Sequence, residues 1–338
     1  MPVLMDRGRP GKRLGPFLEI GLVNNMPDAA LQSTERQFLG LLHAAAVDIP
    51  VRLRLFSLPD VPRSEIGRQY LRSGYRDIGE LWSSRLDGLI VTGTEPRAPS
   101  LPDEPYWASF CKVIDWAQQN TASTIWSCLA AHAAVLHMDG IGRRLLDEKR
   151  SGLFDCVRVS DHPLMTGIPS PMRIAHSRCN ELEAETLTSG GYAILTRSPE
   201  AGVDTFVKQG KSLFVCFQGH PEYDQPALLR EYRRDIGRYL RRERETYPAM
   251  PHGYFDEVAA DMLAAFRNEA LRDRREAMLD GFPAGVLEAR LSVADGSPAT
   301  RIYRNWLSFL CAQKAWRPVA VPARLRRDGA PQTADGIA

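Results

Sequence analysis

Cys128 is a residue whose type and position favour a chemical role. In the stretch TIWSCLAAHAAVLH, residues 124–137, a β-branched and aromatic run ends at this cysteine and an alanine-rich helical pattern follows, with no glycine or proline at the corner. The free N–H groups and the dipole of a helix start favour a thiolate, the form of cysteine that attacks carbonyl groups. Ala130 is small enough for the tight turn that such a nucleophile needs. The alternative is a small core residue, because unreactive cysteines are among the most buried side chains.

A histidine and a glutamate follow the strand-like run SLFVCF, in the segment QGHPEYD at residues 218–224. Residues two apart in an extended chain point to the same side, so the carboxylate of Glu222 is placed to orient the imidazole of His220. Pro221 removes a backbone donor and stiffens the pair. An incidental histidine in a surface turn is the alternative. A cysteine at one strand end and His-x-Glu at another are the groups that acyl transfer requires.

Two other histidines and two polar stretches are weaker candidates. His132 and His137 lie in an apolar helical pattern that is typical of core or helix-end histidines. A zinc deaminase is excluded because no P-C-x-x-C motif follows the H-x-E sequence, and the six widely spaced cysteines predict neither a metal site nor disulfides. The stretches DEKRSGLF (147–154) and AHSRCNE (175–181) offer polar groups for substrate contacts, although each alone is typical of an ordinary loop.

These groups need a scaffold that brings strand ends together, and the chain predicts one. Strand-like and helix-like patterns alternate up to residue 127: strands at 17–25, 51–58, 87–93 and 122–127, helices at 28–45, 63–84 and 104–120. This alternation predicts a mostly parallel sheet flanked by helices, which binds ligands at the carboxyl ends of its strands. The later runs FDCVRV, YAILTRS, GVDTFVK and SLFVCFQ predict hairpins that add antiparallel strands to that sheet. A charged helix at 225–246 and a helical region at 253–314 follow.

Composition indicates which class of protein this is and which partners and cellular compartment to expect. Of the 338 residues, 44% are hydrophobic and 25% are charged, and the net charge of +2 predicts no nucleic-acid partner. No apolar run approaches the roughly 18 residues of a membrane span. The cysteine pattern is typical of reduced thiols in the cytoplasm. We expect a flexible lead (1–15), an α/β catalytic domain (16–248), a helical extension packed on the core (249–316) and a disordered tail (317–338).

A series of short motifs carries a resemblance to a known family. They are, in chain order, NNMPD, ERQFLGLL, DGLIVTG, STIWSC, EKRSG, HSR, GHPEYD, EYRRD and NWL. With these motifs the chain resembles the homoserine O-succinyltransferase family from IGLVNNMP to RNWLSFLCAQ. The resemblance implies cysteine acyltransferase activity on the class I glutamine amidotransferase-like, flavodoxin-like fold.

The same resemblance implies a role for each matching residue. Cys128 matches the cysteine that forms an acyl-thioester, His220 the general base, and Glu222 the acid that supports the base. Lys149 and Ser177 match substrate-contacting positions, and Arg234 matches an arginine that holds the carboxylate of the amino acid.

The implied reaction is a ping-pong transfer from acyl-CoA, the co-substrate, to the hydroxyl of L-homoserine in methionine-type biosynthesis. Backbone N–H groups at the corner, including that of Leu129, are expected to stabilise the oxyanion. The resemblance further implies a homodimer, with no metal and no bound cofactor.

The sequence departs from the family pattern at several positions. The family usually has C-W-x-x-Q after the nucleophile, where this chain has Leu129 and His132. Arg97 of VTGTEPR falls at the position that helps to select the acyl group; an arginine there favours succinyl-CoA, whereas Glu95 in the same pocket favours acetyl-CoA. Asp28 replaces the basic residue that the family often carries after MP.

Three alternatives stay open at the level of sequence. A glutamine amidotransferase uses the same set of cysteine, histidine and glutamate. An acyltransferase can act on serine or another hydroxy amino acid instead of homoserine. A catalytically silent homologue can keep the fold and serve as a binding or regulatory protein.

Overall fold

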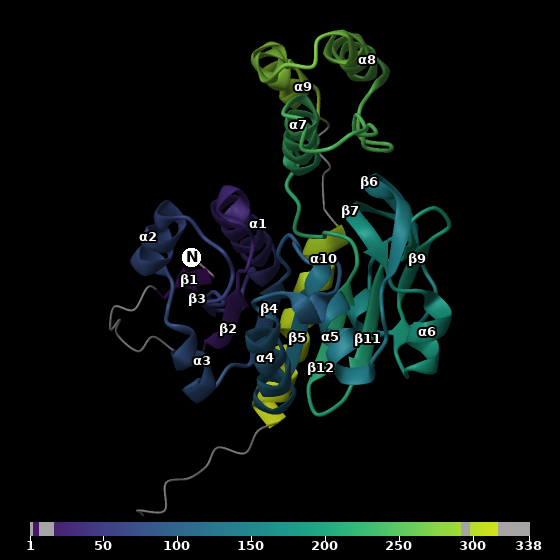
Figure 1. Cartoon of the computed structure of the whole chain (residues 1–338). Helices are drawn as coiled ribbons and strands as arrows, with labels where there is room; N and C mark the ends of the chain where they lie inside the picture. The colour runs from purple at the N-terminus through teal and green to yellow at the C-terminus, as the bar shows by residue number, and fades with distance from the viewer. Residues whose placement is uncertain (1–2, 7–16, 292–297, 317–338) are drawn as a thin grey trace, which may run out of the picture.

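The computed structural model describes residues 3–6, 17–291 and 298–316, and an eight-stranded sheet forms its centre (Figure 1). Its strand order is β1 (Val3–Met5), β3 (Val51–Phe56), β2 (Leu18–Val23), β4 (Gly88–Thr92), β5 (Ser123–Ser127), β12 (Leu213–Phe217), β11 (Thr205–Gln209) and β8 (Ala193–Ile194). Neighbouring strands from β1 to β12 in this order are parallel, and β11 is antiparallel to both of its neighbours. Most of the predicted lead and all of the predicted tail lie outside the described residues, whereas residues 3–5 of that lead form β1.

Helices cover both faces of this sheet. Alternating side chains of each strand point to opposite faces, so Ile125 packs with α1 (Asp28–Ala46) and α10 (Pro298–Trp316), while Trp126 packs with α4 (Trp107–Asn120) and α5 (Leu129–Asp139). The smaller helices α2 (Glu65–Gly74) and α3 (Ile78–Ser83) follow β3. The predicted mostly parallel sheet with flanking helices is therefore confirmed. No helix in the described ranges is long and apolar enough to cross a membrane.

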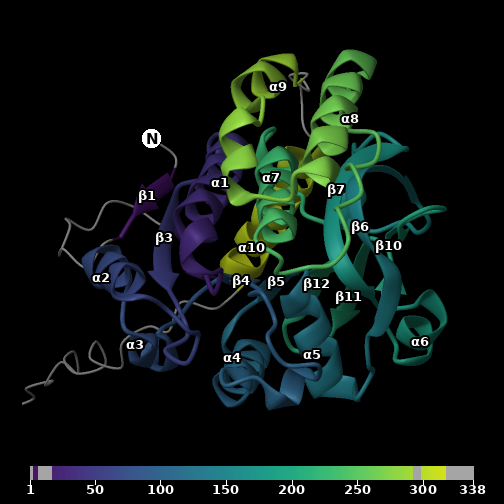
Figure 2. The same ribbon diagram turned by 45° about the horizontal axis from the view of Figure 1, so that its top comes forward.

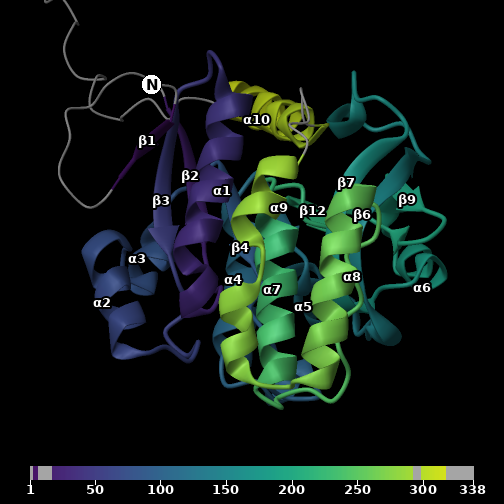
Figure 3. The same ribbon diagram turned by 90° about the horizontal axis from the view of Figure 1, so that it is seen from above.

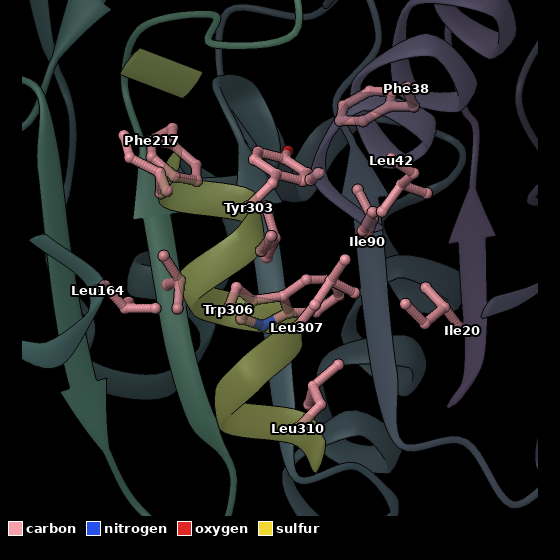
Figure 4. Packing of buried hydrophobic residues seen from close by; sticks show 14 of the residues in the cluster. Ile20, Phe38, Leu42, Ile90, Leu164, Phe217, Tyr303, Trp306, Leu307 and Leu310 are labelled. Atoms are coloured by element: carbon pink, nitrogen blue, oxygen red, sulfur yellow. The ribbon is translucent and has the colours of Figure 1, made fainter. Parts of the chain in front are cut away.

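The C-terminal helix α10 completes the main core. Trp306, Leu307 and Leu310 point from α10 toward the sheet, where they meet Ile20 and Ile90 among others (Figure 4). The indole N–H of Trp306 donates to the Ser123 hydroxyl at 2.9 Å, so its polar atom is satisfied within the core. Helices at opposite ends of the described chain, α1 and α10, thus cover the same face.

A second, four-stranded antiparallel sheet lies beside the first. Its order is β10 (Gly202–Val203), β9 (Thr196–Ser198), β6 (Arg144–Arg158) and β7 (Met172–Glu181), with the short helix α6 (Ala184–Ser189) after β7. The predicted runs therefore divide between the two sheets: β8, β11 and β12 belong to the main sheet, where β12 is parallel to β5, whereas β6, β9 and β10 belong to this one. The stretches at 147–154 and 175–181 lie almost entirely inside paired strands rather than in loops.

Four helical segments form a unit above the main sheet: α7 (Ala227–Leu240), α8 (Glu257–Arg272), the 3-10 helix η3 (Glu276–Gly281) and α9 (Ala284–Arg290). They share a hydrophobic cluster, and α7, α8 and α9 lie side by side when seen from above (Figures 1 and 3). The predicted helix at 225–246 ends at Leu240. The segment before α8 runs along β6 (Figure 2), with His252 N–H donating to Ser151 and Leu153 N–H donating to His252.

Candidate active site

Cys128 lies at the sharp corner between β5 and α5. Its backbone has φ 51° and ψ −112°, a left-handed conformation that L-residues adopt rarely and that is often found where a strained turn presents a functional side chain. The Cys128 N–H donates to the carbonyl of Phe217 at 2.8 Å, and its carbonyl accepts from Ala131 N–H at 2.9 Å. The residue is therefore fixed by the neighbouring strand on one side and by the first helical turn on the other.

The order of the strands brings two further segments to this corner. β5 pairs in parallel with both β4 and β12, so Ser127 lies opposite Thr92 and Phe217. Gly93 leaves β4 directly against the start of α5, where an added Cβ would lie 2.6 Å from Cβ of Leu129. Only glycine permits this close approach.

His220 and Glu222 occupy the segment that leaves β12. Nδ1 of His220 lies 2.9 Å from Oε1 of Glu222, and the same oxygen accepts a hydrogen bond from the Ser127 hydroxyl at 3.0 Å. Both side chains are buried. Ser127 was not among the predicted site residues, although its place immediately before the cysteine is visible in the sequence.

The imidazole of His220 lies within hydrogen-bonding reach of the Cys128 thiol. Because Nδ1 is held by Glu222, Nε2 is the ring atom that remains for the sulfur, and it makes no well-aligned hydrogen bond with any described residue, Cys128 included. Burial lowers the pKa of His220, but Cys128 and Glu222 outweigh burial and raise it well above its usual value. This environment favours the imidazolium form of His220.

Tyr223 connects the imidazole to a second polar group. Its ring stacks on His220 with 4.2 Å between the ring centroids and 19° between the planes. The Tyr223 hydroxyl donates to Oε1 of Glu231 on α7 at 2.7 Å. No sequence pattern indicated this link, since it depends on how α7 packs near the end of β12.

Lys149, Ser177 and Arg234, the predicted substrate contacts, gather around two acids of α7. Nζ of Lys149 lies 2.7 Å from Asp235 and 3.5 Å from Glu231. The Ser177 hydroxyl donates to Glu231, and Arg234 donates to Asp235 at 3.2 Å. Burial alone would raise the pKa of each acid, but Lys149 and Arg234 hold both pKa values below the usual range, so both acids are ionised at neutral pH.

The two acids were not predicted, although the i, i+4 spacing of Glu231 and Asp235 on a charged helix is a signal for a shared face. We call the group formed by Lys149, Ser177, Glu231, Arg234 and Asp235 the acceptor cluster.

Glu95 and Arg97 lie on the segment that follows β4 and differ in their contacts. Glu95 forms an ion pair with Arg238 of α7, with distances of 2.5 and 2.8 Å. The hydrogen bond from Arg238 lowers the pKa of Glu95. The Arg97 residue is exposed, and its backbone N–H donates to Glu104. Glu95 therefore links the β4 segment to the helix that carries the acceptor cluster.

His132 and His137 contact side chains outside the group formed by Cys128, His220 and Glu222. Nε2 of His132 lies 3.1 Å from Oε1 of Gln218, and burial lowers the pKa of His132 to about 3, so the ring is neutral. His137 pairs with Asp115 on α4 at 2.8 Å. Asp28, which stands where the family often has a basic residue, pairs with Arg63 at 3.1 Å.

The fold and the site together define a class: α/β proteins whose strand-to-helix corner presents a cysteine beside a histidine and glutamate pair. A sequence model of the homoserine O-succinyltransferase family matches residues 3–317, and the chain belongs to this family. The predicted family is thereby confirmed, and the chain is an acyltransferase.

Individual relatives agree with this assignment. The chain is 52% identical over 298 residues to a homoserine O-succinyltransferase of Rhodopseudomonas palustris, covering 88% of this chain and 89% of that protein. It is 47% identical over 311 residues to a homoserine O-succinyltransferase of Bradyrhizobium japonicum, covering 91% and 95%. A solved glutamine amidotransferase of Methylobacillus flagellatus is a distant structural neighbour, with 16% identity, a TM-score of 0.47 and coverage of 95% and 99%. That similarity supports no conclusion about chemistry.

Proposed function

We propose that the chain transfers an acyl group, preferentially succinyl, from acyl-CoA to the hydroxyl of L-homoserine through an acyl-thioester on Cys128. The observation that carries this proposal is the corner cysteine beside the imidazole of His220, whose Nδ1 lies 2.9 Å from Glu222. The names of the family and of its relatives supply the acyl group and the acceptor.

In the first half of the reaction, the Cys128 thiolate attacks the carbonyl carbon of the acyl-CoA thioester. The N–H of Leu129 supports the oxyanion, because the first residue of α5 has no intrahelical partner for its N–H. The carbon–sulfur bond to CoA then breaks. The imidazolium of His220 gives its proton to the departing CoA thiolate, which leaves a neutral imidazole and an acyl-enzyme.

In the second half, the neutral imidazole of His220 takes the proton of the homoserine hydroxyl as that oxygen attacks the acyl-thioester. The bond between the acyl carbon and sulfur breaks, O-acyl-homoserine forms and the Cys128 thiolate returns beside an imidazolium. Glu222 keeps the ring oriented in both halves, because its carboxylate faces Nδ1 throughout. These steps use no metal and no resident cofactor.

The acceptor cluster has the charges that an amino acid needs. The guanidinium of Arg234 suits the carboxylate of homoserine, and the ionised Glu231 suits its ammonium group. Tyr223 joins Glu231 to the ring of His220, so binding at the cluster places the acceptor hydroxyl near the base.

Arg97 is the residue that we propose as the partner of the free succinyl carboxylate. It lies on the segment after β4, whose Gly93 packs against Leu129 at the corner. Glu95 is held by Arg238, an arrangement that favours succinyl over acetyl because it keeps this acid paired away from the donor. Arg97→Ala should lower succinyl transfer at least about tenfold and leave acetyl transfer nearly unchanged. Equal losses with the two donors would contradict the assignment.

One experiment separates the candidate reactions. The protein is incubated with succinyl-CoA or acetyl-CoA and with homoserine, serine or no acceptor, while CoA release and the mass of the Cys128 peptide are followed. The proposal requires a succinyl adduct on Cys128 that homoserine removes, and no adduct in Cys128→Ala. Glutamine hydrolysis without acyl transfer would indicate an amidotransferase, preference for serine another acceptor, and absence of any adduct a silent homologue.

The proposal extends to assembly and surroundings. By family resemblance, we propose a homodimer that acts in the cytoplasm in methionine-type biosynthesis. Sedimentation equilibrium of the purified chain tests the dimer, and a molar mass equal to one chain of 37.8 kDa across the working concentrations would contradict it.

A further inference from the structure

A buried histidine and aspartate lie behind the segment that carries His220, and the proposed reaction does not use them. His176 on β7 and Asp204 between β10 and β11 are fully buried, with 3.4 Å between His176 Nε2 and Asp204 Oδ1. The thiol of Cys156 completes a group whose donor atoms all lie within 4.8 Å of one another. Such a group is either a metal site or an imidazole and a carboxylate that face each other beside a cysteine.

Arg178 decides between these two descriptions. Its Nε lies 3.4 Å from Nδ1 of His176, while its other nitrogens donate to the carbonyls of Asn180 and Ala201. A guanidinium only donates hydrogen bonds, so Nδ1 is an acceptor and the ring proton is on Nε2, facing Asp204. Burial and the charge of Arg178 lower the pKa of His176, which keeps the ring neutral. A protonated Nε2 has no lone pair for a metal ion, so the group is a neutral imidazole that faces a carboxylate at 3.4 Å rather than a metal site.

One carboxylate oxygen of Asp204 faces the N–H of His176. Its Oδ2 accepts from the hydroxyls of Thr196 and Thr205 at 2.9 and 2.8 Å. Its Oδ1 has no well-aligned hydrogen bond within the described part of the chain and faces the imidazole. The fully buried carboxylate thus has one oxygen for the threonines and one for His176.

The segment that carries the proposed base, residues 218–220, packs against this carboxylate. A Cβ added to Gly219 would lie 2.6 Å from Asp204 Oδ1 and 2.9 Å from the carbonyl of Ala175, so the backbone of Gly219 packs directly against both. The N–H of Gln218 donates to the Asp204 carbonyl at 2.8 Å, and the N–H of His220 donates to the Ala175 carbonyl at 2.7 Å. Residues on both sides of Gly219 are therefore tied to the elements that hold the pair.

We propose that His176 and Asp204 are positioning residues that fix the backbone at Gly219 and thereby set the ring of His220 against the Cys128 thiol. The inference rests on the proposed role of His220 as the base. His176 and Arg178 lie on the buried side of β7, whereas Ser177, between them, reaches the acceptor cluster. One strand therefore positions the base with one face and contributes to the acceptor cluster with the other.

The test compares two substitutions of His176. Phenylalanine keeps a ring beside Phe154, whose centroid lies 5.6 Å from that of His176, but it cannot donate to Asp204. Glutamine can donate with Nε2 and accept from Arg178 with Oε1. The readout is the rate at which iodoacetamide alkylates Cys128, followed by mass spectrometry of its peptide. This readout needs neither acyl-CoA nor homoserine, so it is independent of the proposed substrates.

We expect His176→Phe to slow alkylation of Cys128 at pH 7 about tenfold and to move the pH profile of alkylation up by about one unit, since a displaced imidazolium no longer supports the thiolate. The kcat for acyl transfer should fall by a similar factor while KM for acyl-CoA stays within about twofold. His176→Gln should restore both rates to within about threefold of the original chain. Unchanged alkylation in a folded His176→Phe variant would overturn the proposal.

Two further measurements test whether the group binds a metal ion and keep the proposal testable if His176→Phe does not fold. Cys156→Ser removes the thiol that a metal site would use and leaves His176 and Asp204 in place, so it should alkylate like the original chain, and metal analysis should find no stoichiometric ion. In the unmodified protein, nitrogen-15 NMR of the histidines should show His176 as the neutral form with its proton on Nε2. A proton on Nδ1, or a bound metal, would overturn the proposal without any substitution.

Discussion

Oε1 of Glu222 receives two hydrogen bonds, from Nδ1 of His220 and from the Ser127 hydroxyl. Ser127 ends β5 and His220 follows β12, so this one oxygen links the strand that leads to the proposed nucleophile with the strand that leads to the proposed base. The carboxylate both orients the imidazole and raises its pKa, because a negative charge nearby favours the imidazolium. Orientation and charge are separable by substitution.

Glu222→Gln removes the charge and keeps a side chain of similar shape. We expect kcat/KM for acyl transfer to fall by about two to four orders of magnitude, because the neutral amide no longer supports the imidazolium and can present its NH2 group to Nδ1. Steady-state kinetics with succinyl-CoA and homoserine measure the loss. Ser127→Ala is the matched control: it removes the second hydrogen bond from the same oxygen and should cost about tenfold or less. Equal losses in the two variants would refute a special role for the charge.

The raised pKa of His220 also affects stability. A group whose pKa is higher in the folded state binds its proton more tightly there, so its contribution is complete below the unfolded pKa of about 6.5 and disappears as the pH rises through the folded value. His220→Asn should therefore lose less stability than the original chain as the pH rises from about 6 to 9. Urea denaturation at a series of pH values tests this, and parallel stability curves for the two proteins would contradict it.

At the scale of elements, two close backbone approaches shape the site. Gly93 lets the end of β4 reach the start of α5, and Gly152 lets the segment before α8 run along β6. At Gly152 the φ angle is 146°, and an added Cβ would lie 2.3 Å from the carbonyl oxygen of His252. Lys149, which belongs to the acceptor cluster, is on the same strand. The glycine of EKRSG is therefore required by the contact between a strand and a distant connection.

Gly152→Ala should separate that connection from β6. The strained φ and the contact with His252 predict a loss of at least about 2 kcal/mol in the free energy of unfolding. We also expect a higher KM for homoserine, because the displaced connection follows α7, the helix that carries Glu231 and Asp235. Thermal denaturation and steady-state kinetics measure the two effects. Gly142→Ala is the control, because nothing lies within 4 Å of a Cβ there and its φ is not positive. A stable Gly152→Ala variant with unchanged KM would contradict the role of this contact.

Gly93→Ala tests the other approach. Its Cβ would lie 2.6 Å from Cβ of Leu129, so the corner must shift and the N–H of Leu129 moves with it. We expect kcat for acyl transfer to fall by about two orders of magnitude, the range seen when one oxyanion donor is misplaced. Formation of the acyl-enzyme in a stopped-flow experiment measures the step directly. The idea fails if this step keeps its original rate while the fold remains intact.

At the scale of the whole molecule, helices from the end of the chain support both the core and the site. α10 fills the face of the sheet opposite α4 and α5, and α7 carries the two acids of the acceptor cluster. The residues proposed for acylation lie at the ends of β5 and β12, while the acceptor cluster joins β6 and β7 to α7. Packing of these parts against each other decides the distance between base and acceptor.

Trp306→Ala should remove a large part of the core between α10 and the sheet. The fully buried indole packs over Gly88, where an added Cβ would lie 2.7 Å from its ring. We expect a loss of about 3–5 kcal/mol in the free energy of unfolding. Chemical denaturation measures it. Ser123→Ala, which removes only the hydrogen-bond partner of the indole, should cost about 1–3 kcal/mol. A loss in Trp306→Ala no larger than that in Ser123→Ala would contradict the packing argument.

The sequence by itself determined the parallel sheet and the positions of Cys128, His220 and Glu222 at strand ends. These features depend on local patterns, namely the alternation of strands and helices, the corner after β5 and the two-residue spacing in an extended segment. The family motifs added Lys149 and Ser177, which the structure places in the acceptor cluster.

Only the tertiary structure decided which groups surround these residues. β7 was not recognised as a strand because its polar residues belong to a hairpin whose two sides serve different neighbours. Tyr223, Glu231 and the pair of His176 and Asp204 gain their roles from partners that are remote in sequence or on other elements. Hydrophobic periodicity reports which side of an element is buried, but it contains no information about which buried or polar group lies opposite, and that pairing sets the hydrogen bonds and the pKa values of the site.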